Sequence, residues 1–387
     1  MNNLTFPTSQ EQKKIVSLLR KIFNREVEIL PKGKKKSDSC EFYFVHNNEK
    51  SVRFILPKKN GCHLLSYLSP STNHSKIILL LLKILYKLRL FGFMPSTSLY
   101  SINGLRNIRW SKYGWIKAQP PNVFIMVGTE KRTQNALLFL DDSHNLKNTL
   151  IVKVSINKLS NLKNEYNVGR VMEANSTQYV RYNSEENFLT QNYYSGYRKV
   201  IDLNNRHVDY LAGLVLKKHK KSGSEVKRNI LNIFNSIDEE HKLCFPDLKP
   251  LLETVKNTSL FYRAHSHGDF APYNIIYKKN SKKFIIIDWE NADLDGLALN
   301  DLFNYVYIKD CLFSKNKSPN IDSFLYLMSQ NYFLKIDAEL NLEDFYQYKI
   351  IIIIREFLLR LKDAGSEDIY VKYLYELIRN ENEKKCL

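Results

Sequence analysis

Two short segments of the chain carry carboxylate and carboxamide side chains in an order that suits phosphoryl transfer. In residues 267–274 (HGDFAPYN), a turn places Asp269 five residues before Asn274. In the second segment the apolar strand 284–287 runs into residues 288–290 (DWE). One carboxylate can orient or deprotonate a hydroxyl, while the amide and the second carboxylate hold a divalent metal on nucleotide phosphates. This division of roles predicts a phosphoryl-transfer site.

These motifs resemble the aminoglycoside phosphotransferase and choline kinase group of small-molecule kinases, which are related in fold to the protein kinases. The resemblance implies that Asp269 is the catalytic base and that Asn274 and Asp288 bind the metal. Glu290 is a further candidate metal ligand. Trp289 follows Asp288 where protein kinases carry Phe, and no Arg precedes Asp269, so the variant is that of the small-molecule kinases.

The resemblance also implies structural roles for two neighbours of the motifs. Asp301 matches the family's later Asp, which braces the catalytic loop, and His267 is assigned to the same bracing. An isolated Asp or Asn in a turn is often only a cap or a turn former. An exposed Glu after a strand, such as Glu290, needs no chemical role at all.

Upstream, the pattern is that of a kinase small lobe. Residues 122–127 and 136–140 predict two strands joined by the polar loop 128–135 (GTEKRTQN). The backbone of Gly128 and the side chain of Lys131 or Arg132 could contact ATP phosphates from such a loop. An ordinary hairpin is an equally good interpretation, since the loop contains a single Gly.

A lysine on the third predicted strand has a candidate partner on the next helix. Lys153 lies midway along the apolar run 150–154, and Glu165 follows twelve residues later near the start of a helix. An ion pair between them would orient the α- and β-phosphates of ATP. Strand lysines are more often solvent-facing edge residues, and Glu173 is an alternative partner.

The segment 188–196 predicts a strand that runs into a turn. In the family this is the hinge where backbone groups bind adenine, so Gln191 lies among the expected nucleotide contacts. Residues 204–262 have a helical pattern with a basic surface run at 217–221. After Asp301 the chain is expected to be helical to its end.

Composition restricts the class of protein. A chain of 387 residues with 44% hydrophobic residues has room for two lobes and ample core. The five cysteines are scattered without zinc-like spacing, and the N-terminus lacks a signal-peptide pattern, which favours the cytoplasm. Net charge is +18, but the lysines are dispersed and accompany no nucleic-acid-binding signature, so no specific nucleic-acid partner is expected.

The most apolar stretch is 77–93. It is interrupted by Lys83, Lys87 and Arg89 and is shorter than the roughly 20 apolar residues of a membrane span. A helix packed on the protein is the favoured interpretation, and peripheral contact with a membrane surface stays open.

We therefore expect an α+β, two-lobe, protein-kinase-like fold. The expected domains are an N-terminal α/β extension (1–120), a small lobe (121–196) and a large lobe (197–387). The expected activity is ATP- and Mg²⁺-dependent transfer of the γ-phosphoryl group to a hydroxyl of a small molecule such as a sugar, aminoglycoside or amino alcohol. The alternative is a non-catalytic, kinase-like nucleotide-binding or scaffold protein, with a membrane-surface role included.

Overall fold

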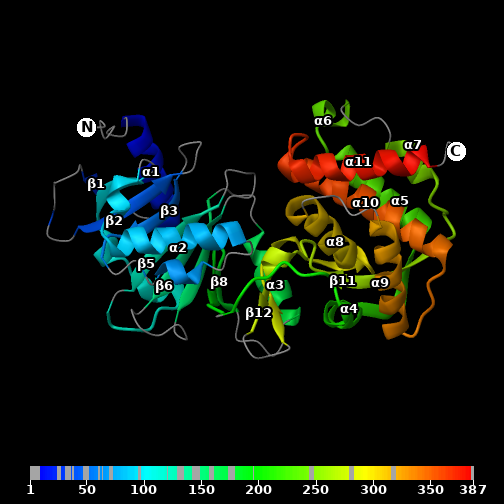
Figure 1. The fold of residues 1–387 in the computed structure, drawn as a ribbon, viewed down its shortest axis with the longest axis horizontal. Helices are drawn as coiled ribbons and strands as arrows, with labels where there is room; N and C mark the ends of the chain where they lie inside the picture. The colour runs from blue at the N-terminus through cyan, green and yellow to red at the C-terminus, as the bar shows by residue number, and fades with distance from the viewer. Residues whose placement is uncertain are drawn as a thin grey trace. The chain divides into compact units, whose positions relative to one another are not determined.

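A computed structural model describes most of the chain and shows a mixed α+β protein (Figure 1). The chain divides into two compact units. Unit 1 comprises residues 1–198 and 276–284, and unit 2 comprises 199–275 and 285–387. The described residues are 9–23, 28–30, 36, 39–46, 52–59, 62, 64–68, 73–94, 97–119, 121–128, 135–141, 149–156, 161–172, 179–194, 196–243, 248–278, 283–314 and 320–384.

Unit 1 is built on one nine-stranded antiparallel sheet. In spatial order its strands are β1 (Glu28–Leu30), β4 (Thr97–Asn103), β2 (Cys40–His46), β3 (Val52–Pro57), β5 (Asn122–Val127), β6 (Asn135–Asp141), β7 (Leu150–Ser155), β9 (Phe188–Asn192) and β8 (Tyr179–Asn183). The segment expected as an extension and the one expected as a small lobe thus contribute strands to the same sheet. They join where β3 pairs with β5. The division at residue 120 stays a prediction.

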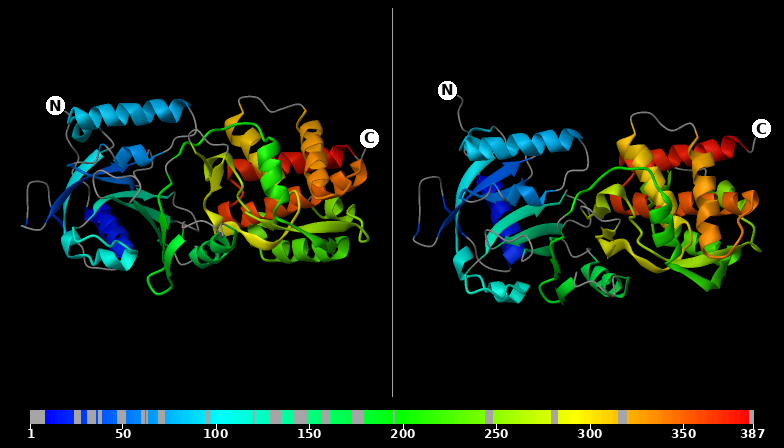
Figure 2. Two further views of the ribbon diagram at one scale, coloured as in Figure 1. Left: turned by 90° about the horizontal axis from the view of Figure 1, so that it is seen from below. Right: turned by 60° about the horizontal axis from the view of Figure 1, so that its bottom comes forward.

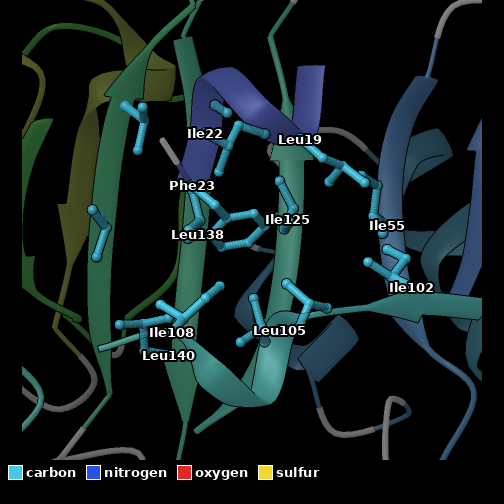
Figure 3. Close-up of a cluster of buried hydrophobic side chains, with 14 of the residues drawn as sticks. Leu19, Ile22, Phe23, Ile55, Ile102, Leu105, Ile108, Ile125, Leu138 and Leu140 are labelled. Carbon is cyan, nitrogen blue, oxygen red and sulfur yellow. The ribbon is translucent and has the colours of Figure 1, made fainter. Parts of the chain in front are cut away.

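Successive side chains of a strand point to opposite sides of a sheet, and the strands of this sheet place apolar residues in two separate buried clusters, so both of its faces are apolar. Helix α1 (Ser9–Phe23) covers one face. Figure 3 shows Leu19, Ile22 and Phe23 of α1 lying against Ile125 and Leu138 of the central strands. The 3-10 turns η3 (Leu105–Asn107) and η4 (Trp110–Tyr113) extend this cluster.

Helix α2 (Asn73–Lys87) covers the opposite face, together with η1 (Leu64–Tyr67) and η2 (Phe91–Phe93). Phe124 and Phe139 of the sheet belong to this second cluster, and their rings are stacked at 5.1 Å between centroids. Figure 2 shows α1 and α2 on opposite sides of the sheet. Helix α3 (Leu162–Met172) contacts β8 and β9.

Unit 2 is mainly helical. Its helices are α4 (Asn205–Ala212), α5 (Gly223–Asn235), α6 (Glu239–Leu243), α7 (Leu248–Glu253), α8 (Asn300–Phe313), α9 (Ile321–Lys335), α10 (Leu342–Ala364) and α11 (Ile369–Glu383). Three strands form a small antiparallel sheet in the order β10 (Val215–Ser222), β11 (Leu260–Ser266) and β14 (Asp293–Leu297). The hairpin of β12 (Ile275–Tyr277) and β13 (Phe284–Ile286) carries the chain out of unit 2 and back.

The expectation of an all-helical segment at 204–262 is wrong. The basic run at 217–221 lies on β10, and the segment ends on β11. Lys221 is buried beside β14, where its ammonium group donates to the Asp295 carbonyl. The isoleucines at 350–354 lie inside α10 and are all buried.

Within the part of the chain that the structure describes, no helix combines the length and apolar character that crossing a membrane requires.

Candidate active site

Three side chains hold the Asp269 carboxylate in unit 2. Arg360 of α10 donates from Nη2 to Oδ1 at 2.6 Å, and the Tyr273 hydroxyl donates to the same oxygen at 3.2 Å. Asn274 donates from Nδ2 to Oδ2 at 3.0 Å and to the Asp269 carbonyl at 2.9 Å. The carboxylate is therefore held at both oxygens by donors that come from two parts of the sequence.

Asp301 anchors the loop that carries Asp269. Its carboxylate accepts hydrogen bonds from the backbone N–H of His267 at 2.6 Å and of Gly268 at 3.0 Å. The Ser266 hydroxyl donates to it at 2.9 Å. Burial raises the pKa of Asp301, while these donors favour the charged form. The contacts confirm the expected bracing role.

His267 and Gly268 fix the path of the same loop. The His267 ring contacts the Ile287 carbonyl through Nε2 at 3.0 Å and the Asp269 N–H through Nδ1 at 3.3 Å. Gly268 has a φ of 76°, and a Cβ there would lie 2.1 Å from the Asn291 carbonyl oxygen. Only glycine fits this close approach.

A backbone hydrogen bond holds the segments of two predicted metal ligands, Asn274 and Asp288, next to each other. The N–H of Ile287, which precedes Asp288, donates to the Asn274 carbonyl at 3.0 Å. Asp288 has the left-handed values φ 70° and ψ 60°, which are uncommon outside glycine and are enriched at functional sites. Because Asn274 Nδ2 faces Asp269, its Oδ1 is the end of the amide that can bind a cation. Glu290 lies on the short 3-10 helix η7 (Trp289–Asn291), half-buried.

Arg360 was not predicted from the sequence, because it lies 91 residues after Asp269 and belongs to no motif. Its Nε also donates to Glu356, one turn earlier on α10, at 2.7 Å. Glu356 is almost fully buried and accepts from Asn304 Nδ2 of α8 at 3.2 Å. Burial acts against the charged form of Arg360, but Asp269 and Glu356 raise the pKa of its guanidinium well above the usual range. The sole signal in the sequence was a Glu–Arg pair at i, i+4 among the apolar residues in the second half of α10.

Tyr273 completes this environment as a neutral donor. Burial, followed by the neighbouring Asp269 carboxylate, raises the pKa of the Tyr273 hydroxyl well above its ordinary value. Asp288 acts in the same direction. The phenol therefore keeps its proton and can donate it in a hydrogen bond throughout the physiological pH range.

Unit 1 contains the second group of predicted residues. Lys153 of β7 and Glu165 of α3 are both buried, and their side chains form an ion pair at 2.8 Å. Gly128 closes the β5–β6 connection through an N–H that donates to the Asn135 carbonyl at 2.8 Å. Gln191 is buried on β9. Lys131, Arg132 and Glu173 lie outside the described residues. The nucleotide-binding roles of this group stay predictions.

Comparison with known proteins gives matches to solved structures alone, since no family model and no curated protein matches the chain. A choline/ethanolamine kinase family protein from Mesorhizobium loti is 14% identical, with 64% of this chain and 84% of that chain covered and a TM-score of 0.40. The Plasmodium vivax ethanolamine kinase is 13% identical, with 68% and 82% covered and a TM-score of 0.43. The aminoglycoside phosphotransferase APH(4)-Ia is 14% identical, with 72% and 99% covered and a TM-score of 0.41. These are the kinds of small-molecule kinase that the motifs at Asp269 and Asp288 resemble.

Proposed function

We propose that the chain is an ATP- and Mg²⁺-dependent phosphotransferase that acts on a hydroxyl of a small molecule. The observation that carries the proposal is the Asp269 carboxylate, held by Arg360, Tyr273 and Asn274 on a loop that Asp301 anchors. A carboxylate fixed in this way is suited to orient an acceptor hydroxyl and to take its proton.

Asp269 has two unequal oxygens. Oδ1 accepts the charged guanidinium of Arg360 at 2.6 Å and the Tyr273 hydroxyl at 3.2 Å, whereas Oδ2 accepts the neutral amide of Asn274 at 3.0 Å and lies 3.5 Å from the same hydroxyl. We assign Oδ2 as the atom that accepts the acceptor's hydroxyl proton. As that proton leaves, the acceptor oxygen bonds to the γ-phosphorus, the bond from this phosphorus to the bridging oxygen breaks, and ADP departs.

The side-chain oxygens of Asn274 and Asp288 are suitable ligands for Mg²⁺. Asn274 Oδ1 and the Asp288 carboxylate are hard oxygen ligands, and magnesium sites commonly use one or two carboxylates together with phosphate oxygens. When bound, Mg²⁺ would neutralise charge on the phosphates. Lys153, oriented by Glu165, would bind the α- and β-phosphates.

A screen for acceptor-dependent ADP formation tests this function. The purified chain is incubated with ATP, Mg²⁺ and a library of sugars, aminoglycosides and amino alcohols, beside the Asp269→Asn variant. We expect at least one acceptor to stimulate ADP release in the parent and not in the variant. If ATP with Mg²⁺ shifts the unfolding temperature but no acceptor is phosphorylated, the protein is a nucleotide-binding, non-catalytic relative.

A further inference from the structure

Helix α2 of unit 1 has apolar side chains on two opposite faces. Leu79, Leu82, Leu85 and Tyr86 form the inner face and pack against the cluster that covers the sheet. The Tyr86 hydroxyl also donates to the Pro57 carbonyl at the end of β3. One face of the helix is therefore sufficient to hold it on unit 1.

The outer face is equally apolar and is exposed. Ile77, Leu80, Leu81, Ile84 and Leu88 recur at the helical spacing i, i+3, i+4, i+7 and i+11, and their exposed fractions run from 43% to 61%. Figure 2 shows α2 lying along one face of the sheet, with no described element of unit 1 covering the side of the helix away from the sheet. Such a contiguous apolar ridge marks an interaction surface.

Basic residues border this ridge. Lys76, Lys83 and Lys87 are spaced i, i+7 and i+11, so they form a row along one edge between the inner and outer faces. No acidic residue occurs from Lys76 to Met94. Phe93, which follows the helix in η2, is 79% exposed. Long lysine side chains can lie along an apolar surface and place their ammonium groups in an anionic layer above it.

We propose that the outer face of α2 docks on the surface of an anionic lipid bilayer. Leucine and isoleucine side chains would enter the boundary between headgroups and acyl chains, while the lysine row would contact the anionic headgroups. A second copy of this chain is a poorer partner, because its lysine row and its net charge of +18 would repel those of the first copy. The inference does not depend on the phosphotransferase proposal.

Flotation of the full chain with lipid vesicles tests the proposal. The protein is mixed with vesicles of phosphatidylcholine alone or with added phosphatidylglycerol, and we expect flotation with the anionic vesicles, weakened by salt. K83Q/K87Q should weaken binding roughly 25-fold, at about fivefold for each cation. L80Q/L81Q should weaken it at least about tenfold, since apolar area enters the interface.

Matched variants in unit 2 test whether vesicle binding depends on the α2 ridge or only on the overall charge and hydrophobicity of the chain. K218Q/K249Q removes the same charge from exposed positions, and L327Q/L334Q removes leucines that are 58% and 70% exposed. Both control variants should float like the parent, and all four double variants should have the same unfolding midpoint as the parent. Equal flotation of ridge and control variants would overturn the proposal, as would failure of the parent to float. Concentration-dependent dimerisation without lipid, lost in L80Q/L81Q, would assign the face to a second copy instead.

Discussion

At the scale of single residues, the arrangement around Asp269 combines a fixed position with an excess of negative charge. Asp269 and Glu356 flank one guanidinium, that of Arg360. A carboxylate that is held before substrate binds loses little freedom on entering the reactive geometry. We therefore expect the Asp269 side chain to contribute chiefly to turnover and little to nucleotide affinity.

Asp269→Asn tests that expectation. The amide cannot take a proton from the acceptor, so kcat should fall by a factor on the order of 10²–10⁴ while ATP affinity stays close to that of the parent. Steady-state kinetics and ATP titration measure the two quantities separately. A variant with near-normal kcat would remove Asp269 from the chemistry.

Arg360→Gln should lower stability as well as activity. Removing the cation leaves the Asp269 and Glu356 carboxylates without their shared guanidinium in a largely buried site, at a cost of about 3–5 kcal/mol in the free energy of unfolding. The double variant with Glu356→Gln should recover part of this loss, because one of the two uncompensated charges is gone. Urea unfolding of the two single variants and the double variant measures the coupling. Strict additivity would show that the two side chains act independently.

The sequence could identify residues whose partners lie nearby in the chain, and it could not identify Arg360. Asp269, Asn274 and Asp288 fall within one turn and one hairpin, so their spacing alone indicates that they lie close together. Arg360 reaches Asp269 only because α10 packs in unit 2, and its one local signal, the i, i+4 spacing from Glu356, is equally typical of a surface arginine. Asp301 was accessible through the family resemblance, not through its own surroundings.

At the scale of secondary structure, the misassigned segment has a clear physical cause. β10 has the sequence VLKKHKKS, which lacks the alternation of apolar and polar residues that predicts a strand. Four consecutive residues of β10 are exposed, and its register shifts between Leu216 and Lys220. The strand exists because β11 pairs with it, and pairing between distant segments is not encoded in local pattern.

Helix α4 carries a buried histidine that should make stability depend on pH. Burial, with a smaller contribution from Arg206, lowers the pKa of His207 to about 4. The unfolded chain then binds more protons between pH about 4 and 6.5, so stability rises with pH through this window and is fully present above it. The expected gain is about 3 kcal/mol.

His207→Gln isolates this contribution. Glutamine can still accept the Asn204 N–H that His207 Nδ1 accepts at 3.3 Å, so the helix cap is kept while the titrating group is lost. Unfolding free energies measured across the acidic range should rise less steeply in the variant. Identical pH profiles of the two proteins would assign the acid sensitivity to other groups.

At the scale of the whole molecule, the sheet topology was the least predictable feature. Strand β4 lies between β1 and β2, and β3 (ending at Pro57) pairs with β5 (beginning at Asn122) although residues 58–121, which include α2, lie between them. Four of its strands, β5, β6, β7 and β9, were predicted from the sequence. The order of the strands was not, because the nine-stranded sheet is apolar on both faces and local pattern therefore does not fix which strands are neighbours.

Ligand binding should be visible in the unfolding of the complete chain, because a ligand that binds only the folded state stabilises it. At a concentration of a hundred times Kd the gain is about 2.7 kcal/mol. If Asp288 holds Mg²⁺ on the nucleotide, then Mg²⁺ should increase the stabilisation by ATP in the parent and not in Asp288→Ala, which lacks a hard oxygen ligand. Asp363→Ala, at an exposed position of α10, is the matched control and should respond like the parent. Thermal unfolding with ATP, with and without Mg²⁺, measures all three proteins. An equal response to Mg²⁺ in the parent and in Asp288→Ala would leave Asp288 as the residue that precedes η7, with its left-handed backbone explained by the turn alone.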